Sequence, residues 1–87
     1  MDYNLTWHED ALKDLRAVDK SASKKIIEKI KTYFIKNPVN LGKPLKGNLK
    51  GLYRYRFGDY RIIYTADLTE REITILTVKH RRKVYKQ

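Results

Sequence analysis

The sequence predicts an α+β fold in which an N-terminal strand and two helices precede an antiparallel meander, with the helices packed on one face of the sheet. Two observations lead to this prediction. Apolar residues recur at helical spacing as far as residue 36, and alternating β-forming residues replace them after residue 51. Because such a sheet buries one face under helices, we expect the other face to stay open. The 87 residues predict one domain, spanning residues 1–87.

The N-terminal part of the chain is predicted to hold a strand and a helix. Residues 2–6 can form a short strand. Thr6 and Glu9 have the spacing of a capping box, in which each side chain bonds to the other's free amide, so we expect the first helix to begin there. One apolar stripe then runs to about residue 18 and comprises Trp7, Ala11, Leu12, Leu15 and Val18.

The second helix has the strongest periodic pattern in the chain. Residues 19–23 are predicted to supply a turn and a new N-cap, and residues 24–36 place isoleucines on one face and lysines on the other. Asn37 and Pro38 end this helix. Residues 37–51 contain three Gly and two Pro without a periodic pattern, so we interpret them as a long connecting loop.

The rest of the chain reads as strands. Residues 52–57, 60–65 and 72–79 alternate in strand fashion, and residues 68–71 form a turn. Gly58 and Asp59 fit a two-residue hairpin turn, which would pair residue 57 with residue 60. In that register Arg56 lies opposite Arg61, and Arg54 shares their face of the sheet.

The positive charge is concentrated in two segments. Twenty Lys and Arg against ten Asp and Glu give a net charge of +10, which favours a polyanionic partner. Residues 24–64 hold eleven bases and two acids, and residues 79–87 hold five bases and no acid. This asymmetry is typical of one basic surface. The lysines of residues 24–36 fit a solvated helix face equally well, but that interpretation does not explain the arginines that follow.

Arg54, Arg56 and Arg61 indicate a phosphate site. Like charges directly across a hairpin cost up to about 1 kcal/mol, and the one acid within residues 52–66 is Asp59 in the turn. Guanidinium groups match phosphate oxygens bidentately and stay charged at physiological pH, so a phosphate ligand would explain the cluster. The alternative is that these arginines discourage aggregation at a sheet edge.

A second group of cations follows the last strand and includes a histidine and a tyrosine. By sequence it can reach the same open face as the arginines; the alternative is a generic basic tail. Its members are Lys79, His80, Arg81, Arg82, Lys83 and Tyr85.

The remaining composition narrows the chemistry. Without Cys the chain has no disulfide, thiolate metal site or thiol nucleophile. The acids are scattered and the glycines fit no phosphate-loop motif, so we expect neither a metal nor another cofactor. Metal-free RNA cleavage asks only that the protein orient the strand, stabilise the phosphate charge and move protons while the 2′-hydroxyl attacks. Residues 1–15 lack the apolar core of a signal peptide and the chain is too short for a separate membrane span, which predicts a cytoplasmic protein without a membrane partner.

The motifs GLYRYRFGDYRIIY at residues 51–64 and VKHRRKVY at residues 78–85 resemble the RelE branch of the RelE/ParE toxin superfamily. The likeness covers nearly the whole chain. It implies a RelE-like fold and a ribosome-dependent endoribonuclease that cuts mRNA in the ribosomal A site. It also implies a cognate antitoxin as partner, whose extended segment wraps the toxin and holds it inactive.

The resemblance also implies site residues. The family's basic residues fall on Arg54, Arg56, Arg61 and Arg81, and its stacking or proton-transferring tyrosine falls on Tyr85. Two of these positions are lysine in well-known members, and an arginine cannot act as a general base. We therefore expect His80 or Tyr85 to transfer the proton. The residues expected to bind RNA more generally are Lys43, Lys46, Lys50, Lys79, Arg82 and Lys83.

The sequence is compatible with three other functions. The ParE branch shares the fold but acts on DNA gyrase, and the presence of Arg61, Arg81 and Tyr85 argues against it. A plain RNA-binding module would bind RNA with a steep salt dependence and leave it intact. A degenerate toxin would only repress transcription together with its antitoxin.

Overall fold

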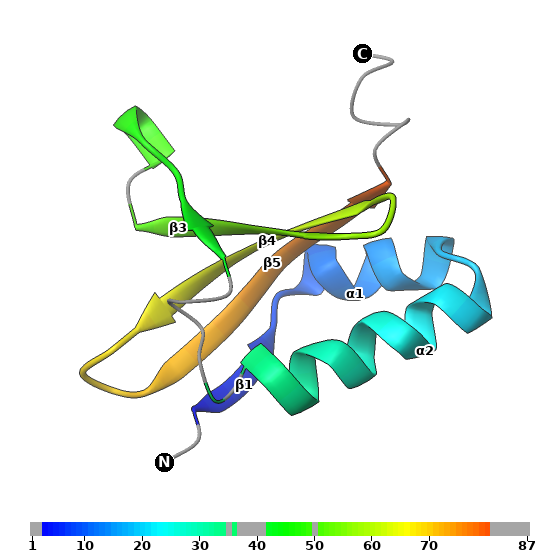
Figure 1. Cartoon of the computed structure of the whole chain (residues 1–87), viewed down its shortest axis with the longest axis horizontal. Coiled ribbons are helices and arrows are strands. Elements are labelled where there is room, and N and C mark those ends of the chain that lie inside the picture. The colour runs from blue at the N-terminus through cyan, green and yellow to red at the C-terminus, as the bar shows by residue number, and fades with distance from the viewer. Residues whose placement is uncertain (1–2, 35, 37–41, 50, 81–87) are drawn as a thin grey trace.

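Two helices cover one face of a five-stranded sheet in the computed structural model of this chain (Figure 1). The structure describes residues 3–34, 36, 42–49 and 51–80. The sheet order is β1-β5-β4-β3-β2, and the α+β fold with helices on one face is confirmed. The elements are β1 (Asn4–Trp7), α1 (Glu9–Ala17), α2 (Lys20–Lys29), the π-helical turn η1 (Ile30–Phe34), β2 (Lys43–Pro44), the 3₁₀ turn η2 (Gly47–Leu49), β3 (Leu52–Phe57), β4 (Tyr60–Asp67) and β5 (Glu72–His80).

The first strand runs further than expected, so the predicted capping box is wrong. Thr6 and Trp7 belong to β1, which pairs in parallel with β5. Helix α1 is capped instead by His8, whose Nδ1 accepts a hydrogen bond from the Asp10 amide at 3.0 Å. The amide of His8 is engaged by the sheet, because it donates to the Ile75 carbonyl at 2.8 Å. The chain therefore leaves the strand and enters the helix within one residue.

The second helix begins earlier than predicted. Asp19 is its N-cap and accepts a hydrogen bond from the Ala22 amide at 3.3 Å, so α2 starts at Lys20 and the turn between the helices is short. The helix continues directly into η1. Ile26 and Ile30 are fully buried, as the periodic pattern predicted.

The predicted loop contains short regular elements. Lys43 and Pro44 form β2 and extend the sheet beyond β3, and η2 follows. A two-residue strand with a proline carries no sequence signal of its own, because its pairing depends on the neighbouring strand.

The hairpin register is confirmed. Phe57 pairs with Tyr60 across the Gly58–Asp59 turn, and Gly58 has the φ of +58° that the first central residue of a type II′ hairpin turn needs. Strand β4 pairs with β5 in the same antiparallel manner.

A bulge in β5 sets which residues face the helices. Ile63 pairs with Thr77 but Tyr64 pairs with Ile75, which leaves Leu76 without a cross-strand partner. As a result Ile75 and Val78 both point to the core although they are three residues apart. The core lies between the helices and this face of the sheet and comprises Ala11, Leu15, Ile26, Ile30, Ile62, Tyr64, Ile73, Ile75 and Val78. In the part of the chain that is described, no helix is long and apolar enough to cross a membrane.

Candidate functional site

Cross-strand pairing gathers five cations on one face of the sheet. Directly opposed residues of an antiparallel pair project from the same face. Arg56 pairs with Arg61, and Arg61 pairs with Lys79. Lys43 pairs with Arg54, which shares a face with Arg56 because the two are two residues apart. We call this surface the basic face, and it comprises Lys43, Arg54, Arg56, Arg61 and Lys79.

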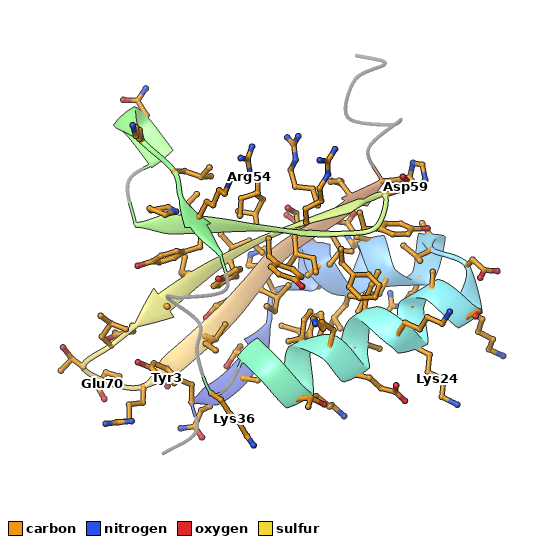
Figure 2. All side chains as sticks on the ribbon, viewed as in Figure 1. Tyr3, Lys24, Lys36, Arg54, Asp59 and Glu70 are labelled. Atoms are coloured by element: carbon orange, nitrogen blue, oxygen red, sulfur yellow. The ribbon has the colours of Figure 1, made fainter. Side chains whose placement is uncertain are left out.

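The basic face points away from the helices. Ile62, next to Arg61 in β4, is fully buried in the core under the helices, so Arg61 projects to the other side. Arg54 projects from the sheet away from both helices (Figure 2). Arg56 is exposed, and Arg54 and Arg61 are partly buried. The register therefore puts the arginines on the open side of the sheet, whereas Ile62 and Tyr64 lie on the helix side.

Charge changes sign along this side of the sheet. The cations occupy the end near the β3–β4 turn, whereas Asp67 and Glu72 pair with each other at the opposite end of β4 and β5. Arg56 and Arg61 lie directly opposite each other, an arrangement that costs up to about 1 kcal/mol without an anion. A polyanion would relieve that repulsion, and among the described residues of this side of the sheet the cations lie at one end and the acids at the other.

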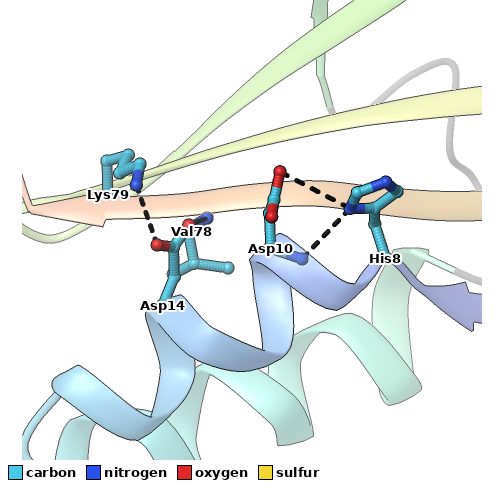
Figure 3. Close-up of polar contacts among 5 residues, drawn as sticks. All are labelled: His8, Asp10, Asp14, Val78 and Lys79. Carbon is cyan, nitrogen blue, oxygen red and sulfur yellow. Dashed lines mark hydrogen bonds and ion pairs between the residues drawn. The ribbon is translucent and has the colours of Figure 1, made fainter.

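Lys79 forms an ion pair with an acid of α1. Its Nζ donates to Asp14 Oδ1 of α1 at 2.8 Å (Figure 3). No motif in the sequence singled out Asp14. Its position could have indicated a buried polar contact, because it lies three residues after Ala11 and next to Leu15, on the side of the helix that faces the core.

His80 lies on the other side of the sheet from the arginines. It pairs with Tyr60, and the two rings meet edge to face with centroids 5.0 Å apart. Tyr60 packs against the core. The structure thus places His80 on the helix side, whereas Arg54, Arg56 and Arg61 project from the open side.

One further predicted residue, Lys46, lies within the described part of the chain. Lys46 is exposed between β2 and η2. The others fall outside the described residues: Lys50, Arg81, Arg82, Lys83 and Tyr85. Within the described ranges no group of three or more His, Cys, Asp or Glu could hold a metal ion.

A second feature lies on the helix side, where α2 and η1 approach the end of β3. A cavity of about 320 Å³ opens between them, and Phe57 supplies its aromatic wall. The other lining residues are Lys25, Glu28, Lys29 and Thr32. The cavity is apolar at the sheet and mainly basic at the helix, which suits an acidic segment with an apolar side chain.

Comparison with known families identifies the class of protein. A family described as "ParE toxin of type II toxin-antitoxin system, parDE" matches residues 5–85. The chain belongs to this family of toxins. Toxin RelE of Mycobacterium tuberculosis is 30% identical over 84 residues, covering 97% of this chain and 87% of that protein. Putative toxin RelE1 of Methanocaldococcus jannaschii is 35% identical over 89 residues, covering 99% of this chain and 98% of that protein.

Solved structures agree with this assignment. The toxin–antitoxin complex RelBE2 of Mycobacterium tuberculosis contains a chain that matches with a TM-score of 0.89 and 28% identity, covering 93% of this chain and all of that one. The archaeal RelE–RelB complex of Pyrococcus horikoshii matches with a TM-score of 0.74 and 30% identity, covering 93% and 97%. The resemblance to RelE/ParE toxins is therefore confirmed. The family carries the ParE name and these relatives the RelE name, so similarity alone fits either branch.

Proposed function

We propose that this toxin inhibits translation by cutting mRNA in the ribosomal A site, in the manner of RelE rather than of ParE. The main support is that Arg56 pairs with Arg61 and that Arg54 lies beside them. No described helix covers this face of the sheet (Figure 1). Three guanidinium groups so close together have a physical reason if a phosphate binds between them.

The proposed reaction uses the RNA's own nucleophile. The 2′-hydroxyl loses its proton and attacks the adjacent phosphorus, the bond to the 5′-oxygen breaks as that oxygen takes up a proton, and a 2′,3′-cyclic phosphate and a 5′-hydroxyl result. Arg54, Arg56 and Arg61 would stabilise the negative charge that grows on the phosphate oxygens, with Arg81 as a fourth contributor by resemblance. No step in this scheme asks for a metal.

The proton transfer requires a different group. Arginine stays protonated and cannot accept the 2′-hydroxyl proton. Of the two candidates, His80 packs against Tyr60 on the helix side of the sheet, and this supports giving the role to Tyr85. Tyr85→Phe should then lower cleavage, whereas His80→Gln should leave the cleavage rate within a few-fold of the parent.

The proposal is tested by removing one guanidinium group from each side of the sheet. Arg61→Ala should lower the rate of mRNA cleavage on programmed ribosomes by about 100-fold, the usual cost of losing one group that stabilises a developing oxyanion. The matched control is Arg16→Ala, which removes the same charge from the exposed last turn of α1 and should leave the cleavage rate unchanged. Equal rates for both variants would refute the assignment of the site.

An antitoxin is the proposed protein partner, since solved relatives are toxin–antitoxin complexes. The cavity beside Phe57 is one place where an acidic antitoxin segment could dock, with an apolar side chain against the ring and carboxylates near Lys25 and Lys29. Phe57→Ala should weaken the complex by more than tenfold in Kd. An unchanged Kd would exclude this cavity from the interface.

Inhibition of DNA gyrase is the second candidate, and the description of the matched family favours it. The two functions differ in their targets. A gyrase inhibitor would block supercoiling of plasmid DNA in vitro without cutting any message, and Arg61→Ala would have no special effect in that assay.

A further inference from the structure

Asp14 connects helix α1 to the last strand of the sheet. Its Oδ2 accepts a hydrogen bond from the Val78 amide at 2.9 Å, and its Oδ1 accepts one from Lys79 Nζ at 2.8 Å (Figure 3). The Asp14 side chain is only 13% exposed, whereas that of Lys79 is 50% exposed. One carboxylate therefore bonds to a main-chain donor and to a cation at the same time.

The strand pairing explains the main-chain contact. Strand β1 covers the outer edge of β5 as far as the pair of Trp7 with Ile75. Beyond that point the Val78 amide faces outward from the sheet edge, and α1 brings Asp14 to it. The carboxylate thus satisfies an edge donor that lies beyond the pairing of β1 with β5.

The second contact matters for the basic face. Lys79 lies directly opposite Arg61, so its side chain begins beside the arginines. The ammonium group is nonetheless bound at the sheet edge by Asp14. A phosphate that recruited Lys79 would have to replace a short, charge-assisted hydrogen bond, so it would gain little net free energy from that lysine.

We propose that Asp14 determines specificity by withholding Lys79 from polyanions that reach the basic face. This inference rests on the proposed binding of RNA there. Withholding one lysine lowers the affinity for any polyanion, because each phosphate contact releases counterions irrespective of sequence. The contacts that remain come from arginines, whose planar forks demand a particular phosphate geometry. Asp14 therefore reduces non-specific binding more than it reduces binding of correctly placed mRNA.

Asp14→Asn separates the two contacts of this residue. The asparagine oxygen can still accept the Val78 hydrogen bond, whereas the charge that holds Lys79 is lost. For binding of a 12-nucleotide uridine RNA, the slope of log K against the logarithm of the salt concentration should become steeper by about 0.7. That is the contribution of one phosphate contact to a single strand. At 0.1 M salt that slope corresponds to about fivefold tighter binding. A purely structural role for Asp14 would weaken binding or leave it unchanged.

Two further variants control for charge and for fold. Asp10→Asn adds the same charge to α1 at an exposed carboxylate that lies beside His8, and it should leave the salt slope unchanged. Adding Lys79→Gln to Asp14→Asn should return both the slope and the affinity to those of the parent. Thermal unfolding of each variant verifies that it is folded, and a heparin fragment serves as a second polyanion that does not depend on RNA cleavage.

The outcomes distinguish this inference from the proposed function. If the parent binds RNA and cleaves mRNA while Asp14→Asn binds RNA and heparin no more tightly, the role of Asp14 is refuted and the proposed function stands. Equal gains for Asp10→Asn and Asp14→Asn would also refute it. If tighter binding appears with heparin but the parent cleaves no message, Asp14 retains its role on the basic face and the proposed enzyme activity fails.

Discussion

At the scale of single residues, strand alternation separates two chemistries in β3 and β4. Arginines project from the open side, and tyrosines project toward the helices. Tyr64 is fully buried there, and its ring stacks on that of Tyr53 with centroids 5.5 Å apart. Gly42 approaches so closely that any larger residue would collide with the Tyr64 hydroxyl. The aromatic side therefore fixes the strands whose other side holds the arginines.

Burial predicts how this protein responds to alkaline pH. Desolvation raises the pKa of the Tyr64 hydroxyl well above its ordinary value of 10.0, a nearby Tyr53 raises it further, and a backbone hydrogen bond with Gly42 partly opposes them. The unfolded chain therefore loses this proton at lower pH than the folded protein does. The stabilisation is fully present below pH 10.0 and is lost as pH rises toward the folded pKa.

Tyr64→Phe tests this linkage. The free energy of unfolding, measured by urea titration between pH 8 and pH 11, should fall less steeply above pH 10 for the variant than for the parent. Identical slopes would show that Tyr64 ionises equally in both states. Tyr53→Phe serves as the control for the other tyrosine of the stacked pair.

At the scale of elements, the β3–β4 hairpin determines which residues of the basic face lie opposite each other. Its two-residue turn aligns Phe57 with Tyr60 and thereby Arg56 with Arg61. The turn depends on Gly58, whose φ of +58° lies in the left-handed region. A longer turn or a slip of one residue would move the arginines to the other face.

Gly58→Ala should lower the free energy of unfolding by about 1–2 kcal/mol, the cost of a side chain in the left-handed conformation. Gly58→Asn should cost less, because asparagine adopts that conformation more readily. Urea denaturation of the two variants compares them directly. A loss that was equal for both would mean that the turn changes shape when the glycine is replaced.

The hairpin also shows what sequence could predict and what it could not. Alternation and a two-residue turn are local signals, so the register of Arg54, Arg56 and Arg61 followed from them. The parallel pairing of β1 with β5 and the contact of Asp14 with Lys79 join residues far apart in the chain, and no local pattern encodes them. His80 was expected to reach the open side of the sheet, but it lies on the helix side. Charge alone does not reveal which face the end of a strand presents, and the bulge in β5 shifts the alternation before His80.

At the scale of the whole molecule, the net charge of +10 is organised rather than spread evenly. One side of the sheet holds the basic face and the other carries the helices. The cavity beside Phe57 lies on the helix side, so a partner there need not occupy the basic face. The same small fold thus has two separate candidate surfaces, one for the proposed RNA and one for the proposed antitoxin.

The central claim is that the basic face acts on messenger RNA, and one measurement tests it most directly. The chain is induced alone in a bacterium, mRNA 5′ ends are mapped across the transcriptome, and the supercoiling of a reporter plasmid is followed in the same cells. We predict growth arrest, new 5′ ends in phase with codons and normal plasmid supercoiling. With Arg61→Ala, the growth arrest and the new 5′ ends should disappear, and supercoiling should stay normal. Growth arrest with intact messages and relaxed plasmids would contradict the proposal and assign the chain to gyrase inhibition.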